Sequence, residues 1–285
     1  MLLRIIRKVP KKYHKVINFS YKVWGNFSGS NGLSRCSSLA YTLLFAFIPF
    51  SISIVSISAW LPVSEEITNN IEYYFFSQYI PQLGHQVYDL FKFSFSHTKR
   101  LSIFGFISLF VTSYGMMFSI EQHIHDMWHL KRQRKLIYSF IVFSGFFVVG
   151  TIFIFVMAYF TEFVQVRVTH GIVYENMGRV SAHIVTIVSF ISIYKFIPSV
   201  KVKWLHAIIA GIGAAIAFII LQLGFTASMD YLQKDYELLY GSLAMLPIFL
   251  LWLYLSVLIL LLGAQVIYVL RTSPAKRKIL GSVLQ

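Results

Sequence analysis

The chain has 285 residues, of which 57% are hydrophobic and only 13% are charged, and its formal net charge is +14. A basic balance of this size often indicates a nucleic-acid partner, so the positions of the charges decide how it is interpreted. There is one cysteine, Cys36, which excludes disulfides within the chain.

Long stretches of the chain are nearly free of charge. About 20 consecutive apolar residues cross a bilayer as a helix, because only a helix satisfies the backbone polar groups within one segment. We therefore expect an all-α integral membrane protein with six transmembrane helices. The predicted spans are about 38–60, 101–120, 137–160, 180–197, 205–226 and 243–269.

Lys and Arg are concentrated in alternate connections between these spans. The segment before span 1, the second and fourth loops and the C-terminal tail hold 19 of the 25 cations, while nine of the 11 acids lie in the other loops. Positive charge stays in the cytoplasm, so both termini are predicted to be inside. The net charge then needs no nucleic-acid partner; the expected partners are the lipid bilayer and its anionic inner-leaflet lipids.

The expected organisation is a cytoplasmic interfacial segment, 1–35, a six-span membrane domain, 36–270, and a basic cytoplasmic tail, 271–285. Apolar residues recur at helical spacing among the cations of 1–35, which favours a helix lying on an anionic surface; the alternative is a disordered basic tail. The first outer loop, 62–100, has the pattern of two amphipathic helices.

Prolines and small residues mark three of the predicted spans. Pro49 predicts a kink in span 1, and Pro247 predicts a bend in span 6. Gln265, near the inner end of span 6, is expected to need a partner within the bundle. Span 5 has a predicted packing face of small residues, comprising Ala207, Gly211, Ala214, Ala217 and Gly224, with Ala210 and Gly213 beside it. The acidic residues Asp230, Asp235 and Glu237 are expected in the outer loop that follows.

Span 2 carries a stripe of small and polar residues spaced alternately three and four apart, which places them on one helix face. The members are Gly105, Ser108, Thr112, Gly115, Ser119, Gln122 and Asp126. Such a stripe is typical of a close-packing seam between helices. It can also line a hydrated cavity or a substrate path.

The inner end of span 2 is the part of the chain richest in titratable residues. Glu121, His125 and His129 are spaced to share one helix face, which makes them a weak candidate for a metal site. The alternative is a solvated helix end, and the four cations at 131–135 oppose a bound dication. We find no nucleophile, nucleotide-binding, cofactor or metalloprotease motif, and predict no catalytic residues, no cofactor and no enzyme activity.

Two stretches resemble a known family. Span 1 contains RCSSLAYTLLFAFIP, from Arg35 through Tyr41 to Pro49, and span 6 contains YGSLAMLPIFLLWLYLS, beginning at Tyr240 and Gly241 and including Pro247, followed by Gly263 and Gln265. With Met127–Trp128 and the basic run that follows, the chain resembles the YihY/BrkB family of bacterial inner-membrane proteins. Many members of the family would have Glu where this chain has Gln265.

The resemblance implies a six-helix protein of the bacterial inner membrane. Members have carried a ribonuclease label that is widely regarded as misassigned, and others are linked to lipid A precursor export or serum resistance. The leading hypothesis is a transporter or flippase-like protein for a lipid or other amphiphile. The alternative is a non-transporting scaffold in envelope biogenesis. The sequence opposes a tRNA-processing ribonuclease, because Glu121 and Asp126 are the only carboxylates predicted to face the cytoplasm.

Overall fold

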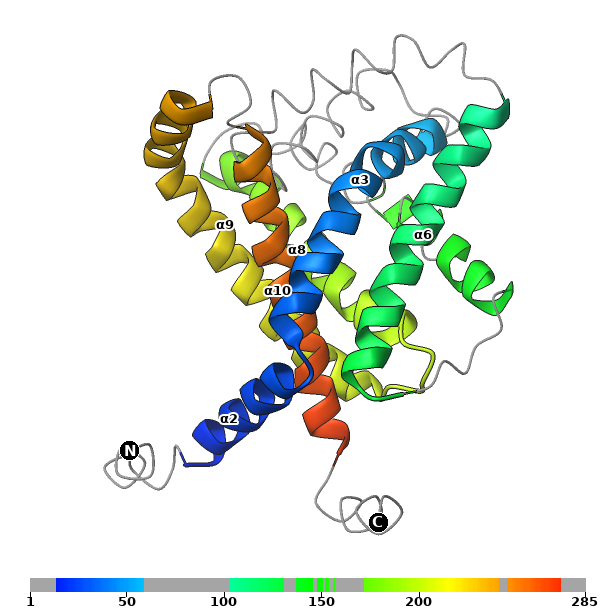
Figure 1. Cartoon of the computed structure of the whole chain (residues 1–285), viewed down its shortest axis with the longest axis vertical. Helices are drawn as coiled ribbons and strands as arrows, with labels where there is room; N and C mark the ends of the chain where they lie inside the picture. The colour runs from blue at the N-terminus through cyan, green and yellow to red at the C-terminus, as the bar shows by residue number, and fades with distance from the viewer. Residues whose placement is uncertain are drawn as a thin grey trace.

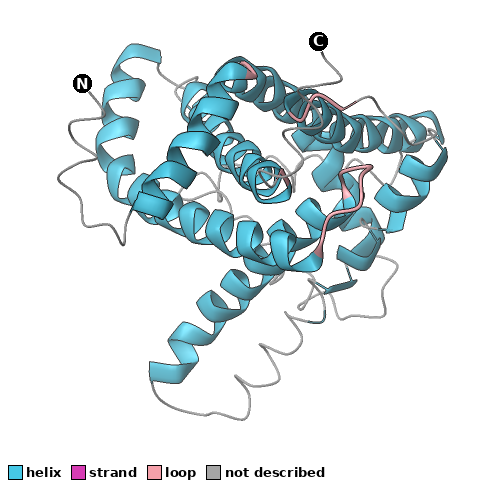
Figure 2. Cartoon of the chain, turned by 90° about the horizontal axis from the view of Figure 1, so that it is seen from below, coloured by secondary structure: helices cyan, strands magenta, loops and turns pink. Residues whose placement is uncertain are grey.

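The structure of the chain is a computed structural model. It describes residues 14–58, 103–130, 137–145, 148–150, 152–153, 156, 172–240 and 245–272. Within these ranges the chain forms helices joined by short loops, and the described part contains no strand (Figure 2). The helices are α2 (His14–Gly29), α3 (Gly32–Ser58), α6 (Ile103–Met127), α8 (Ile172–Phe196), α9 (Trp204–Tyr240) and α10 (Met245–Arg271). A further apolar helical segment covers Ile137–Gly150.

Each of the six predicted spans overlaps a described helix, although several helices are longer than the predicted spans. Two stretches, Trp204–Ser228 and Leu246–Arg271, are long and apolar enough to cross a membrane, and Ile137–Gly150 and Val180–Phe196 are shorter apolar stretches. Residues 1–13 and the predicted helices of the loop 62–100 lie outside the described residues.

The predicted acidic loop after span 5 is helical, because α9 continues to Tyr240. The acidic residues therefore lie on a helical continuation beyond the apolar stretch that ends at Ser228. The stretch from Met229 to Tyr240 contains no glycine or proline and several good helix formers, and the next glycine in the sequence is Gly241, a residue type that commonly follows a helix end.

The two prolines have different surroundings. Pro247 is the third residue of α10; residues 241–244 before it lie outside the described residues, so the bend predicted at Pro247 stays a prediction. In the first turn of a helix a proline costs no hydrogen bond, because the N–H groups there have no intrahelical acceptor. Pro49 lies inside α3, which remains helical across it and whose ribbon changes direction in its C-terminal half (Figure 1).

Helix α10 is the central element of the described part. It contacts α9, α3, α2 and α6, while α8 packs on α9 and α3 packs on α6. The helices converge toward the C-terminal end of α10 and spread apart toward its other end (Figure 1).

One end of the molecule collects the start of α3, the ends of α6, α8 and α10, and the start of α9. The Trp128 indole N–H, just after α6, donates to the Ala264 carbonyl at 3.2 Å and the Trp128 ring stacks on Tyr268 of α10. We call this region the basic end, defined by the cations Lys22, Arg35, Lys195, Lys201, Lys203 and Arg271. That it faces the cytoplasm is a prediction from the charge pattern.

Small residues allow close contacts between α8, α9 and α10. A Cβ on Gly211 of α9 would lie 2.9 Å from the backbone N and Cα of Ile191 on α8, and a Cβ on Gly263 of α10 would clash with the hydroxyl of Tyr194. That hydroxyl donates to the Leu260 carbonyl at 2.9 Å. Glycine at positions 211 and 263 therefore sets how closely these helices approach each other.

The predicted small-residue face of span 5 is only partly a packing face. Ala207, Ala210, Gly211 and Ala214 are buried. The other two members of the face, Ala217 and Gly224, are exposed, so the prediction was wrong for them; Gly213 beside the face is also exposed. The packed residues recur three to four apart, and the exposed ones are turned away from that face.

Candidate functional site

The C-terminal end of α6 is closed by a left-handed residue. His129 has a φ of 52°, the Leu130 N–H donates to the His125 carbonyl at 2.9 Å, and the His129 N–H donates to the Asp126 carbonyl at 3.2 Å. This is the hydrogen-bond pattern of a Schellman motif. His129 therefore lies beyond the helix and does not continue the face of Glu121 and His125.

The weak metal-site prediction for Glu121, His125 and His129 was consequently wrong as a three-residue site. His129 is exposed after the left-handed turn, whereas Glu121 and His125 are buried. In the part of the chain that the structure describes, no group of three His, Cys, Asp or Glu side chains is arranged to hold a metal ion.

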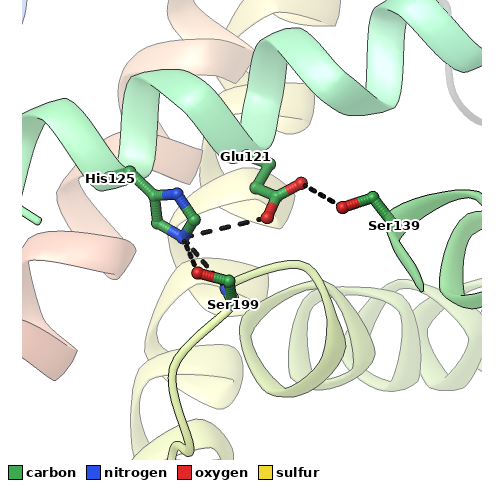
Figure 3. A network of polar contacts seen from close by, with 4 residues as sticks. All are labelled: Glu121, His125, Ser139 and Ser199. Atoms are coloured by element: carbon green, nitrogen blue, oxygen red, sulfur yellow. Dashed lines mark hydrogen bonds and ion pairs between the residues drawn. The ribbon is translucent and has the colours of Figure 1, made fainter. Parts of the chain in front are cut away.

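Glu121 and His125 belong instead to a buried polar cluster with two serines (Figure 3). Glu121 is 1% exposed and its Oε2 accepts a hydrogen bond from Ser139 Oγ at 3.2 Å. The His125 Nε2 lies 3.0 Å from the Ser199 backbone N, 2.9 Å from Ser199 Oγ and 4.0 Å from Glu121 Oε1. We call Glu121, His125, Ser139 and Ser199 the polar cluster; it joins α6, the segment after it and the α8–α9 loop.

The contact with Ser199 sets the hydrogen-bonding role of one ring nitrogen of His125. A backbone N–H can only donate, so Nε2 is the acceptor of this hydrogen bond. The arrangement also differs from that of a catalytic triad, in which the acid and the serine contact opposite ring nitrogens. Here Glu121 and Ser199 approach the same nitrogen, whose lone pair already accepts the Ser199 amide.

A pocket of about 200 Å³ lies beside the polar cluster. Its lining combines polar and apolar side chains, comprising Phe118, Glu121, Gln122, His125, Asp126 and Leu130. A pocket that combines acids, an amide and an imidazole with apolar side chains can hold a group that is itself amphiphilic.

An ion pair stands at the rim of this pocket. The Arg35 Nη1 of α3 lies 2.8 Å from Asp126 Oδ2 of α6, and the Arg35 Nε donates to the Ser30 carbonyl at 2.9 Å. His123 lies on the same helix end, beyond the predicted span. Burial lowers the pKa of His123 below its usual range and the Arg35 cation lowers it further, while Asp126 acts in the opposite direction.

The predicted stripe on span 2 lies along α6, but its described part is not a close-packed seam. Gly115 is exposed with no atom within 4 Å of a Cβ built on it, Gln122 and Asp126 are exposed, and Ser119 is half-buried. The side chains of the other members of the stripe, Ser108 and Thr112, and the surroundings of Gly105 lie outside the described residues. The stripe and the buried pair Glu121–His125 thus occupy adjacent faces of one helix, and the pocket adjoins both.

Sequence reasoning missed Ser139 and Ser199. Ser139 is fully buried on the helical segment Ile137–Gly150, and Ser199 lies in the loop after Pro198. A lone serine has no spacing pattern, so the only available signal was a polar residue within an otherwise apolar stretch.

The positions that carried the family resemblance have varied surroundings. Arg35 forms the ion pair with Asp126, and Tyr41 is exposed with its ring edge against Phe45 at 4.9 Å between centroids. Tyr240 is the last residue of α9, and Gly263 makes room for Tyr194. The side chain of Pro49 and all of Gly241 lie outside the described residues.

Gln265 does not find the partner that the sequence predicted within the described part of the bundle. It is 1% exposed, and its Oε1 has no hydrogen-bond partner among the described residues.

Comparison with known proteins identifies the family. The family model described as Virulence factor BrkB matches residues 23–282. The chain belongs to the BrkB family. The match covers all the described helices except the first part of α2, including the polar cluster and the pocket.

Curated relatives of this BrkB-family chain are named membrane proteins. It is similar to a UPF0761 membrane protein of Psychrobacter sp. (strain PRwf-1), with 32% identity over 274 residues, 94% of this chain and 51% of that protein. A UPF0761 membrane protein of Nitrosospira multiformis is 28% identical over 270 residues, 92% of this chain and 63% of that protein. A third relative, from Haemophilus influenzae (strain 86-028NP), is 27% identical over 260 residues, 87% of this chain and 93% of that protein.

The chain therefore spans about half to two thirds of the length of the first two relatives. No solved structure matches it. The family and the apolar helices establish a membrane protein of the BrkB family.

Proposed function

We propose that this BrkB-family protein is a six-span protein of the bacterial inner membrane that moves a lipid or another amphiphile between leaflets. The pocket beside the polar cluster is the part of the path nearest the basic end. Membership of the BrkB family supports a membrane protein, and transport is proposed from the residues around the pocket.

The observation that carries the proposal is a buried polar cluster next to a pocket. Buried polar and ionisable groups are costly, so they are rare in folded proteins and often mark functional sites. Glu121 and His125 are 1% and 3% exposed, and they line a pocket that is also bordered by the exposed Gln122. A purely structural helix end would place these residue types in water.

Exposed aromatic residues at the basic end support insertion in a membrane. Trp24 on α2 is 52% exposed and Trp204 at the start of α9 is 55% exposed. Tryptophan is enriched at membrane–water interfaces, and cations on the same side attract anionic lipids. We expect α2 to lie against the inner leaflet through Tyr21, Lys22 and Trp24.

The alternative is a scaffold without transport, and the close packing of α8, α9 and α10 favours it. The two functions differ at the pocket. A transporter needs the pocket to open, so filling it slows translocation, whereas a scaffold gains or loses nothing from the same change.

Reconstitution into liposomes tests the proposal. Fluorescent phospholipids of several headgroups and charged amphiphiles would be assayed for movement between leaflets, with protein-free liposomes as a baseline. We expect translocation by the wild type, strong slowing by the pocket-filling variant Gln122→Trp, and no change in the control Gly213→Ala, which adds a methyl group in open space. Absence of translocation across the whole panel, or equal rates in Gln122→Trp and wild type, would contradict the proposal.

A further inference from the structure

The α8–α9 loop, residues 197–203, has an inner and an outer face. Ile197, Val200 and Val202 are buried, whereas Lys201 and Lys203 are exposed. The same loop presents Ser199 to His125 on its inner side. One short loop therefore connects the surface of the basic end with the polar cluster.

Lys195 holds this loop in shape. Its Nζ donates to the Val202 carbonyl at 2.6 Å and lies 4.7 Å from the centre of the Trp204 ring. Phe196 packs edge-on against Trp204, with 6.0 Å between ring centres. The Lys195 ammonium thus interacts within the protein, with the Val202 carbonyl and the face of the Trp204 ring.

Lys201 and Lys203, unlike Lys195, point their charge to the outside of the loop. Neither forms an ion pair with any residue that the structure describes, and both are exposed. Beside them the ring of Trp204 is 55% exposed and Leu205 is 65% exposed. We call Lys201, Lys203, Trp204 and Leu205 the loop surface: two cations next to an amphipathic aromatic ring and an apolar side chain.

We propose that the loop surface binds the phosphate-bearing headgroup of an anionic phospholipid in the leaflet at the basic end. Two ammonium groups complement the phosphate charge. Tryptophan is enriched at membrane interfaces, so we expect Trp204 at the level of the headgroups and Leu205 beside the acyl chains. A zwitterionic lipid offers the same apolar contacts without the net charge, so the loop surface discriminates by charge.

The bound lipid also acts on the polar cluster. Because the loop carries Ser199 on its inner face, a headgroup on Lys201 and Lys203 keeps the Ser199 N–H on the Nε2 of His125. Anionic lipid thereby stabilises the arrangement that borders the pocket. This regulatory step rests on the proposed transport function, whereas lipid binding by the loop surface does not.

Quenching of Trp204 by brominated lipids tests the binding. Wild type and Trp204→Phe would be reconstituted with brominated phosphatidylglycerol or brominated phosphatidylcholine, and the fluorescence difference between the two proteins isolates Trp204. Trp204 is half-exposed, so its replacement leaves the core intact. We expect stronger quenching by the anionic lipid. The double variant Lys201→Gln/Lys203→Gln is made with and without Trp204→Phe. In this variant we expect the ratio of the affinities for the anionic and the zwitterionic lipid to fall by about thirtyfold.

The matched control is Lys22→Gln on α2, which removes a cation from the basic end away from the loop and leaves the Trp204 preference unchanged. Equal quenching by both lipids in the wild type, or equal loss of preference in Lys22→Gln and in the double variant, would overturn the inference. Charge-selective quenching in a protein that translocates nothing would support the lipid site and reject the proposed transport.

Discussion

The packed region of α8, α9 and α10 and the polar cluster at the end of α6 are built on opposite principles. In the packed region, glycine and alanine recur along single helices, and contacts such as Gly211 on Ile191 follow from that spacing. In the polar cluster, the pair Glu121 and His125 on α6 meets two serines from other segments: Ser139 lies 18 residues from Glu121, and Ser199 lies 74 residues from His125. Close packing depends on the absence of bulky side chains from one helix face, whereas the polar cluster depends on how the fold places segments that are distant in the sequence.

The largest effect is expected from adding one methyl group to the packed region. Gly211→Ala places a Cβ 2.9 Å from backbone atoms of Ile191, which cannot move without shifting α8. Overpacking of this kind costs roughly 1–3 kcal/mol of unfolding free energy. Thermal unfolding can be followed with a thiol-reactive fluorogenic dye, because Cys36 is free and 0% exposed in the folded chain.

Gly213→Ala is the control on the same helix, two residues away. Its Cβ meets nothing within 4 Å, and alanine is a better helix former than glycine. We expect an unchanged or slightly higher midpoint of unfolding. If the two alanine variants unfolded at the same temperature, the close approach of α8 and α9 would not be a determinant of stability.

An effect of comparable size, which depends on a single hydrogen bond, is expected in the polar cluster. His125→Leu removes the acceptor of the Ser199 N–H and leaves polar groups without a partner, which costs about 1–3 kcal/mol. His125→Gln keeps an acceptor oxygen in reach and should retain most of the stability. The same dye assay on both variants makes the comparison. Equal loss in Gln and Leu would mean that the ring's shape, and not its hydrogen bond, matters.

The smallest effect is expected for the Arg35–Asp126 ion pair. Its side chains are 26% and 45% exposed, and solvent-exposed pairs contribute about 0.2–1 kcal/mol. A double-mutant cycle with Arg35→Gln and Asp126→Asn isolates the coupling. Raising the salt concentration should reduce the coupling. A coupling free energy well above this range would contradict the expectation and would show that the ion pair stabilises the basic end as strongly as the buried polar cluster does.

The sequence predicted the helices well because a helix in lipid must be long and uncharged, and both properties can be read along the chain. It also predicted that the inner end of span 2 holds unusual chemistry. It misplaced His129, because a left-handed cap at the end of α6 leaves no mark on helical spacing. It missed Ser139 and Ser199, because their contacts depend on how the segment Ile137–Gly150 and the α8–α9 loop pack against α6. It also predicted a partner for Gln265, whose Oε1 has no hydrogen-bond partner among the described residues.

The central position of α10 has a consequence for how the protein is made. The helix follows in the sequence every helix that it contacts, and synthesis runs from the N-terminus. The earlier helices therefore leave the ribosome before the element that joins them. During that interval the Trp128 indole lacks the Ala264 carbonyl, and Tyr194 lacks both the Leu260 carbonyl and the space beside Gly263. The pairs α3–α6 and α8–α9 can pack before α10 is made, and the bundle is completed only when α10 joins them.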